Sequence, residues 1–204
     1  MKPKSRAQIF RFTPQDIFFP LVLLVTLIIA YGLPMLHLGF QGDDWHLIWL
    51  QYRIGNLSPF FNLTRVSTQW AFQLFMPLLA PIPAQWIWLN VGLRWLGGMG
   101  LFLLINALFP GKKQWAGSFC LLFCLYPGYL MSFFPVTFLA ALLQPAGLFF
   151  SFYFMVLSLK KDDAPRGWLT ALALVCSTAN LLLSEYFLFL ELLRPFLIQR
   201  TLQL

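Results

Sequence analysis

Long apolar segments dominate this chain and restrict what it can fold into. They cover residues 17–38, 84–109, 115–134, 136–159 and 167–190. A helix needs about 20 mostly apolar residues to cross the hydrocarbon core of a bilayer. Only helices and closed barrels satisfy their own backbone hydrogen bonds there. We therefore predict an all-α, polytopic integral membrane protein with about five transmembrane helices in one transmembrane domain.

Composition supports the membrane class and excludes several others. Hydrophobic residues make up 59% of the chain and charged residues 10%, whereas soluble domains carry about 25% charged residues. The net charge is +7, but Lys and Arg stand in short groups beside apolar runs. Nucleic acid would need a basic face or stripe, so we expect membrane lipid and no nucleic acid as a partner. Cys120, Cys124 and Cys176 lie inside apolar runs, which favours packing over metal binding.

The distribution of positive charge predicts the orientation in the membrane. The tail 1–16 carries four Lys or Arg residues, the turn 110–114 carries two, and the turn 160–166 carries three. Cytoplasmic loops are enriched in these residues. We therefore place the N-terminus in the cytoplasm and the loop 39–83 on the periplasmic or extracellular side.

The C-terminal end follows from the same count. Five spans place it on the outer side, where the apolar stretch 192–204 contains Arg194 and Arg200. This stretch resembles the start of further structure. Either the gene product is short or the chain is the N-terminal part of a longer protein, and we expect the second.

The loop 39–83 is rich in aromatic residues and long for a connection. Apolar and polar residues alternate from 44 to 54, which predicts a short amphipathic helix ending at Gly55. A second, weaker amphipathic piece covers 67–79. Helices of this kind lie along the membrane interface.

Two adjacent carboxylates, Asp43 and Asp44, precede the first of these helices. The whole chain contains seven acidic residues, so a pair at a membrane boundary is notable. One interpretation is structural: Asp43 caps the helix and Asp44 interacts with its dipole. The other is functional. One carboxylate could act as a base toward an acceptor hydroxyl, or the pair could hold a divalent cation against a phosphate.

Other charges fall within the apolar segments. Arg94 lies about ten residues into its span, where a charge costs about 2.5–3.5 kcal/mol on insertion scales. It should pair with Glu185 or Glu191, or else contact a lipid phosphate. Arg194 follows Glu191 by three residues, which suits a pair on one helix. Glu185 has no basic residue at such a spacing, and its role is either structural or functional.

The order of these features resembles the N-terminal module of the polyprenyl-phosphate-sugar-dependent membrane glycosyltransferases of the GT-C superfamily. The shared features are a charged tail, one span, the Asp43-Asp44 motif and an amphipathic outer helix, followed by alternating spans. Arg65, Tyr126-Pro127 and Ser184-Glu185 are weaker similarities. The resemblance covers the whole chain as topology, and the acidic motif is its specific part.

The resemblance implies inverting transfer of a sugar from a lipid-phosphate-linked donor to an acceptor on the outer face. Asp43 and Asp44 would be catalytic, with Asp43 as the base because it is the first of the pair. Arg65, Arg94 and Glu185 would bind substrate. The family has further spans and outer loops, so we expect these residues alone to form an incomplete donor site.

A second hypothesis is a non-enzymatic polytopic membrane protein, such as a transporter subunit or a structural partner. Prolines and glycines interrupt two spans near 126–128 and 144–147, as in transporters with broken helices. No internal repeat accompanies them. The two hypotheses differ in whether Asp43 is needed for sugar transfer.

Overall fold

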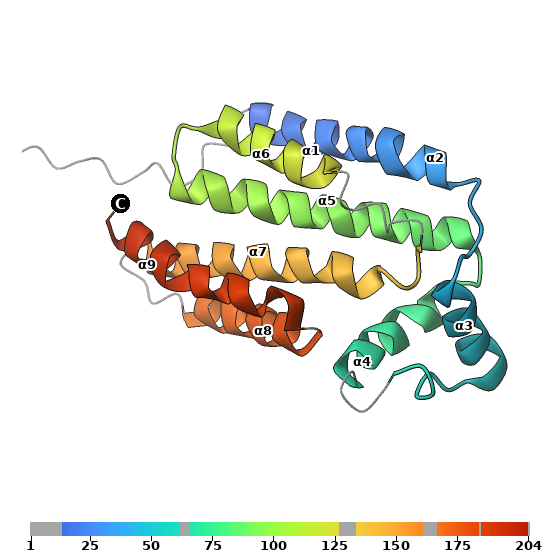
Figure 1. Ribbon diagram of the computed structural model, residues 1–204. Helices are drawn as coiled ribbons and strands as arrows, with labels where there is room; N and C mark the ends of the chain where they lie inside the picture. Colours follow the sequence, from blue (N-terminus) through green and yellow to red (C-terminus); the bar gives the residue numbers. More distant parts are fainter. Residues whose placement is uncertain (1–13, 62–65, 127–133, 161–166, 184, 204) are drawn as a thin grey trace, which may run out of the picture.

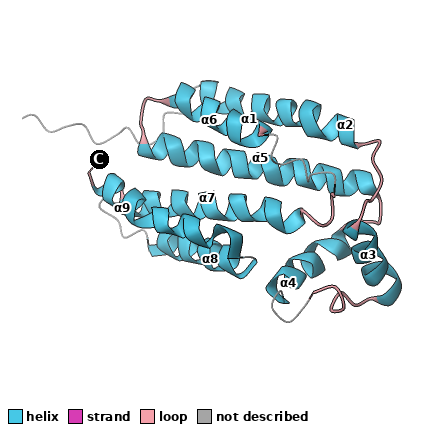
Figure 2. Cartoon of the chain, viewed as in Figure 1, coloured by secondary structure: helices cyan, strands magenta, loops and turns pink. Residues whose placement is uncertain are grey.

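The computed structural model describes residues 14–61, 66–126, 134–160, 167–183 and 185–203. Within these ranges the regular structure is helical and contains no strand (Figures 1 and 2). The all-α prediction is therefore confirmed. The elements are α1 (Pro14–Leu27), η1 (Ile28–Gly32), α2 (Leu33–Met35), α3 (Asp43–Trp49), η2 (Leu50–Ile54), α4 (Val66–Phe75), η4 (Met76–Leu78), α5 (Pro83–Leu108), α6 (Lys113–Leu125), α7 (Leu139–Leu159), α8 (Gly167–Leu183), η6 (Glu185–Leu193) and α9 (Arg194–Leu202).

Three helical stretches of the described chain are long and apolar enough to cross a membrane. They are Phe18–Met35, α5 and α7, and they coincide closely with three of the predicted spans. The shorter helix α8 is apolar but has 17 residues. The range 115–134 begins as α6, which ends at Leu125, and residues 127–133 lie outside the described ranges. The described chain thus contains three candidate membrane-spanning helices, and the number of five crossings stays a prediction.

The stretch Phe18–Met35 stays helical through a π turn, η1. The backbone N–H of Leu33 donates to the carbonyl of Ile28, five residues earlier. Pro34 follows directly, and a proline inside a helix lacks an N–H and clashes with the carbonyl four residues before it. Widening the helix over one turn relieves this clash without ending the helix.

The long helices form a bundle in which α5 is central, running antiparallel to α1 and α6 and parallel to α7 (Figure 1). It packs against α7, α6 and α1, and α7 packs in turn against α8 (Figure 1). Glycines allow this close approach: a Cβ at Gly98 would lie 2.5 Å from Cys124 Sγ and 2.9 Å from Leu23 Cδ2. Small residues have the same role in other membrane helix pairs. Cys120 and Cys124 are buried at these contacts.

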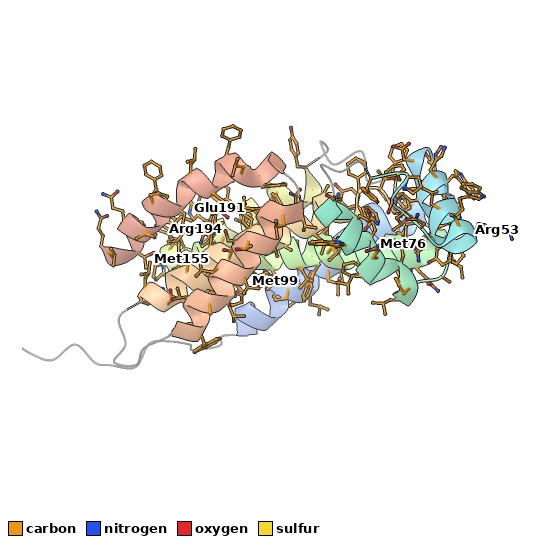
Figure 3. All side chains as sticks on the ribbon, turned by 90° about the horizontal axis from the view of Figure 1, so that it is seen from below. Arg53, Met76, Met99, Met155, Glu191 and Arg194 are labelled. Atoms are coloured by element: carbon orange, nitrogen blue, oxygen red, sulfur yellow. The ribbon has the colours of Figure 1, made fainter. Side chains whose placement is uncertain are left out.

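The C-terminal segment departs from the prediction of one span over 167–190. Helix α8 ends at Leu183, and η6 and α9 return along α7, with the C-terminus at the same end of the bundle as the α5–α6 turn (Figure 1). The side of the membrane on which the C-terminal end lies stays a prediction. Polar contacts hold the returning segment. The guanidinium of Arg194 pairs with the Glu191 carboxylate at 2.7 Å and donates to the Ser151 hydroxyl at 3.0 Å. It lies beside the sulfur of Met155 (Figure 3).

The loop 39–83 is a folded cap at the opposite end of the bundle, built from α3, η2, α4 and η4 (Figure 1). Its inner face contributes Leu47, Phe72 and Met76 to a buried cluster with Trp86 of α5 and Leu139 of α7. Its outer face exposes large apolar side chains, among them Trp45, Trp49, Trp70 and Leu78. Helices therefore cover much of the predicted amphipathic ranges, and their position in the membrane plane stays a prediction.

Candidate functional site

The acidic pair lies in the first turn of α3, where the cap meets the bundle. The residue at the N-cap position is Gly42, with φ +52°, and it makes no side-chain cap. A Cβ on Gly42 would lie 2.7 Å from the ring of Phe134, so glycine suits both the backbone angle and the contact. The interpretation of Asp43 as the N-cap is therefore wrong, because Asp43 is already the first helical residue.

Asp44 is fully buried and binds the turn that precedes α7. Its Oδ1 accepts hydrogen bonds from the backbone N–H of Val136 at 3.1 Å and of Thr137 at 2.8 Å. The hydroxyl of Thr137 donates a third, at 2.7 Å. Helix N-termini leave backbone N–H groups unpaired, and a carboxylate satisfies them well. Asp44 thus holds, from a distant part of the chain, the turn that leads into α7.

The second oxygen of Asp44 has a different environment. Oδ2 is buried and has no hydrogen-bond partner among the described residues. Burial raises the pKa of this carboxyl above its ordinary value of 3.8, against the opposing effect of the Thr137 and Val136 hydrogen bonds. Desolvation disfavours the charged form, which explains the direction. Asp44 is consequently a structural anchor whose charge is costly.

Asp43 differs from its neighbour because its side chain is exposed. The two carboxylates therefore have different surroundings, one in the protein interior and one at the surface of the cap. Among the described residues there is no group of three His, Cys, Asp or Glu side chains that could hold a metal ion. Oδ1 of Asp44 accepts three hydrogen bonds inside the protein, whereas the Asp43 side chain is open to solvent.

A second polar side chain holds the same turn from the bundle. Asn90 of α5 is buried, and its Nδ2 donates to the carbonyl of Pro135 at 2.8 Å. The turn 135–137 is therefore bound by Asp44 from the cap and by Asn90 from the bundle. Sequence reasoning missed the role of Thr137, since a hydroxyl residue two positions after a proline gives no signal by itself.

Arg94 lies one helical turn beyond Asn90 and is also buried. Its guanidinium sits 3.8 Å from the centre of the Tyr31 ring, and Nη1 lies 3.5 Å from the carbonyl oxygen of Cys124. Cation–π contact offsets part of the cost of burying this charge. Asn90 and Arg94, four residues apart on α5, line one narrow cavity together with Tyr31, Met35, Ile87, Val91 and Leu142.

The positions of the remaining predicted site residues relative to the pair stay a prediction. Arg65 lies outside the described residues, and Glu185 begins η6 with a side chain that is also outside the description. Glu191 is bound by Arg194 and by the hydroxyl of Ser177, so it is not the expected partner of Arg94. The predicted Glu191–Arg194 pair is confirmed.

Comparison of the chain with protein-family models, with curated proteins and with solved structures finds no match.

Proposed function

We propose that this chain is part of a membrane glycosyltransferase that transfers a sugar from a polyprenyl-phosphate donor, with Asp43 as the general base. The observation that supports it is the division of the acidic pair. Asp44 is buried and bound to the turn before α7, and Asp43 is exposed beside it on the cap. Asp44 would be a positioning residue that fixes the first turn of α3, and with it the Asp43 carboxylate.

The proposed step needs one proton acceptor. Asp43 takes the proton of the acceptor hydroxyl as that oxygen bonds to the anomeric carbon of the sugar. The bond from this carbon to the phosphate oxygen breaks with inversion, and polyprenyl phosphate leaves with the electron pair. Arg65 and Glu185 remain the proposed contacts to the donor. We assign Arg94 to helix packing, because its guanidinium is already stacked on Tyr31.

The proposed orientation places the cap on the outer side of the membrane. The basic residues Lys112, Lys113 and Lys160 lie at the α5–α6 turn and the end of α7, opposite the cap (Figure 1). Placing this end in the cytoplasm follows the positive-inside rule. It puts Asp43 at the periplasmic or extracellular water boundary, where a lipid-linked donor presents its sugar.

The test uses the full-length gene product in membranes, supplied with a panel of polyprenyl-phosphate hexoses and pentoses. The readout is release of polyprenyl phosphate, measured by mass spectrometry. Asp43→Asn should reduce release by about 10²–10⁴-fold, the usual contribution of a general base. Its melting temperature should match that of the wild type, because the side chain is exposed. A normal rate with Asp43→Asn would show that the base is another group.

The alternative is a non-enzymatic polytopic membrane protein, either a transporter subunit or a structural partner. One observation favours it: the hydrogen bonds of Asp44 account for a buried carboxylate without any chemistry. On this hypothesis no donor in the panel is consumed by the wild type. Asp44→Ala then lowers the melting temperature, and Asp43→Asn has no effect in either assay.

A further inference from the structure

A groove opens at the basic end of the bundle, far from the acidic pair. It lies between the end of α5 and the start of α6 and has a volume of about 550 Å³. This is within the range of about 300–1,000 Å³ that is usual for small-molecule sites. The side chains that line it are Ile105, Phe109, Lys112, Trp115 and Phe119.

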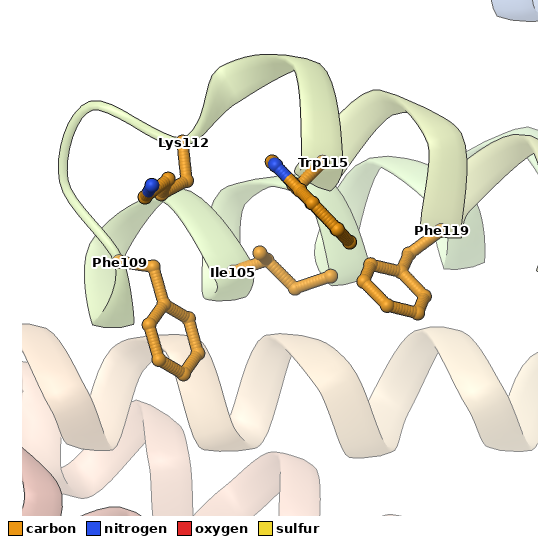
Figure 4. A pocket seen from close by; sticks show the side chains of 5 residues that line it. All are labelled: Ile105, Phe109, Lys112, Trp115 and Phe119. Atoms are coloured by element: carbon orange, nitrogen blue, oxygen red, sulfur yellow. The ribbon is translucent and has the colours of Figure 1, made fainter.

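The groove is apolar along most of its length and basic at one end. Lys112 and the nitrogen edge of Trp115 lie toward the α5–α6 turn, and Phe119 lies at the other end, further along α6 (Figure 4). Trp115 is 62% exposed and Phe119 is 51% exposed, so the groove opens outward from the bundle. Tryptophan is enriched at the level of lipid headgroups, where its ring meets both water and hydrocarbon.

Positive charge and helix geometry converge at the basic end. Lys112 is the N-cap residue of α6, and its side chain makes no capping hydrogen bond. The first N–H groups of a helix attract anions, above all phosphate. Gly111, with φ +85°, forms the tight turn that places Lys112 there. The guanidinium of Arg200 lies 5.4 Å from the ring centre of Phe109, which adds a second cation beside the groove.

We propose that this groove binds one anionic phospholipid from the bilayer leaflet at the basic end of the bundle. Its phosphate contacts Lys112 and the N-terminus of α6. An acyl chain follows the groove past Ile105 to Phe119. The site does not depend on the proposed transferase activity. A phospholipid is the occupant because the groove joins a phosphate-binding end to an apolar channel in a helical membrane protein, where a soluble anion would leave the channel empty.

The test measures lipid retention by the purified chain. Native mass spectrometry compares phosphatidylglycerol with phosphatidylcholine, which have similar acyl chains and different net charge. A lysine near an anionic surface is worth about 1 kcal/mol, so Lys112→Gln should reduce the preference for phosphatidylglycerol about fivefold. Lys160→Gln is the matched control at the same end of the bundle, outside the groove, and should keep the preference.

A second pair of variants tests the apolar wall. Trp115→Ala should lower retention of both lipids, whereas Trp168→Ala should not, because Trp168 is equally exposed at the start of α8 and does not line the groove. Melting temperatures verify that each variant is folded. Equal losses in Lys112→Gln and Lys160→Gln would show diffuse attraction and overturn the proposal. The proposal would also fail if Lys112→Gln kept the wild-type preference for phosphatidylglycerol. It would fail as well if inorganic phosphate alone stabilised the protein as much as the phospholipid does.

Discussion

The hydrogen bonds of Asp44 to the turn before α7 should contribute measurably to stability. Asp44→Ala removes the acceptor of three hydrogen bonds, with donor–acceptor distances of 3.1, 2.8 and 2.7 Å. Each buried donor left unpaired costs about 1–3 kcal/mol. Thr137 is only part-buried, so water reaches some of these groups. We therefore expect the free energy of unfolding to fall by about 3–6 kcal/mol, the lower part of the range for three unpaired donors.

Thermal unfolding in detergent, followed by tryptophan fluorescence, measures this loss. For a chain of this length about 1 kcal/mol lowers the melting temperature by about 2–4 °C, so Asp44→Ala should melt about 6–24 °C below the wild type. Asp44→Asn should lose far less, about 0–2 kcal/mol. The amide keeps an acceptor oxygen and removes a charge that is costly to bury.

Asp43→Ala is the matched control, since it changes the neighbouring carboxylate in the same turn. Exposed substitutions of this kind stay within about 0.5 kcal/mol. If Asp44→Ala and Asp43→Ala melted at the same temperature, the three hydrogen bonds would not hold the cap to α7. The proposed positioning role of Asp44 would then fail as well.

Further predictions concern pH, packing and the returning C-terminal segment. Burial raises the pKa of Asp44 above 3.8, so the stabilising effect of its proton is full below that pH and is lost as pH rises through the raised pKa. As pH rises from 3.8 through the raised pKa, the melting temperature of the wild type should therefore fall relative to that of Asp44→Asn. An unchanged difference would contradict a raised pKa for Asp44. Gly98→Ala should cost about 1–3 kcal/mol by overpacking against Cys124 Sγ, and adding Cys124→Ala should restore part of the melting temperature. Glu191→Gln leaves the part-buried Arg194 without its ion partner and should cost about 1–3 kcal/mol, seen as faster proteolysis within 185–202. Equal proteolysis of variant and wild type would show that the apolar contacts of the segment suffice.

Much of the fold could be predicted from local patterns in the sequence. Apolar length alone identified Phe18–Met35, α5 and α7, because the thickness of the bilayer sets the length of a spanning helix. The three-residue spacing identified the Glu191–Arg194 pair, which bridges the junction of η6 and α9. These features depend on residues within a few turns of each other, and helical geometry is the same in every fold.

Local sequence patterns were therefore enough to predict helices that suit a lipid bilayer and the periodic faces of those helices. The tertiary structure decided which neighbours those faces meet. It placed Val136 and Thr137 against Asp44 across more than ninety residues and turned the chain back after Leu183. It also made one aspartate an anchor and left the other exposed. Two adjacent identical residues carry no local signal that distinguishes them, because the difference comes from the distant backbone that one of them binds.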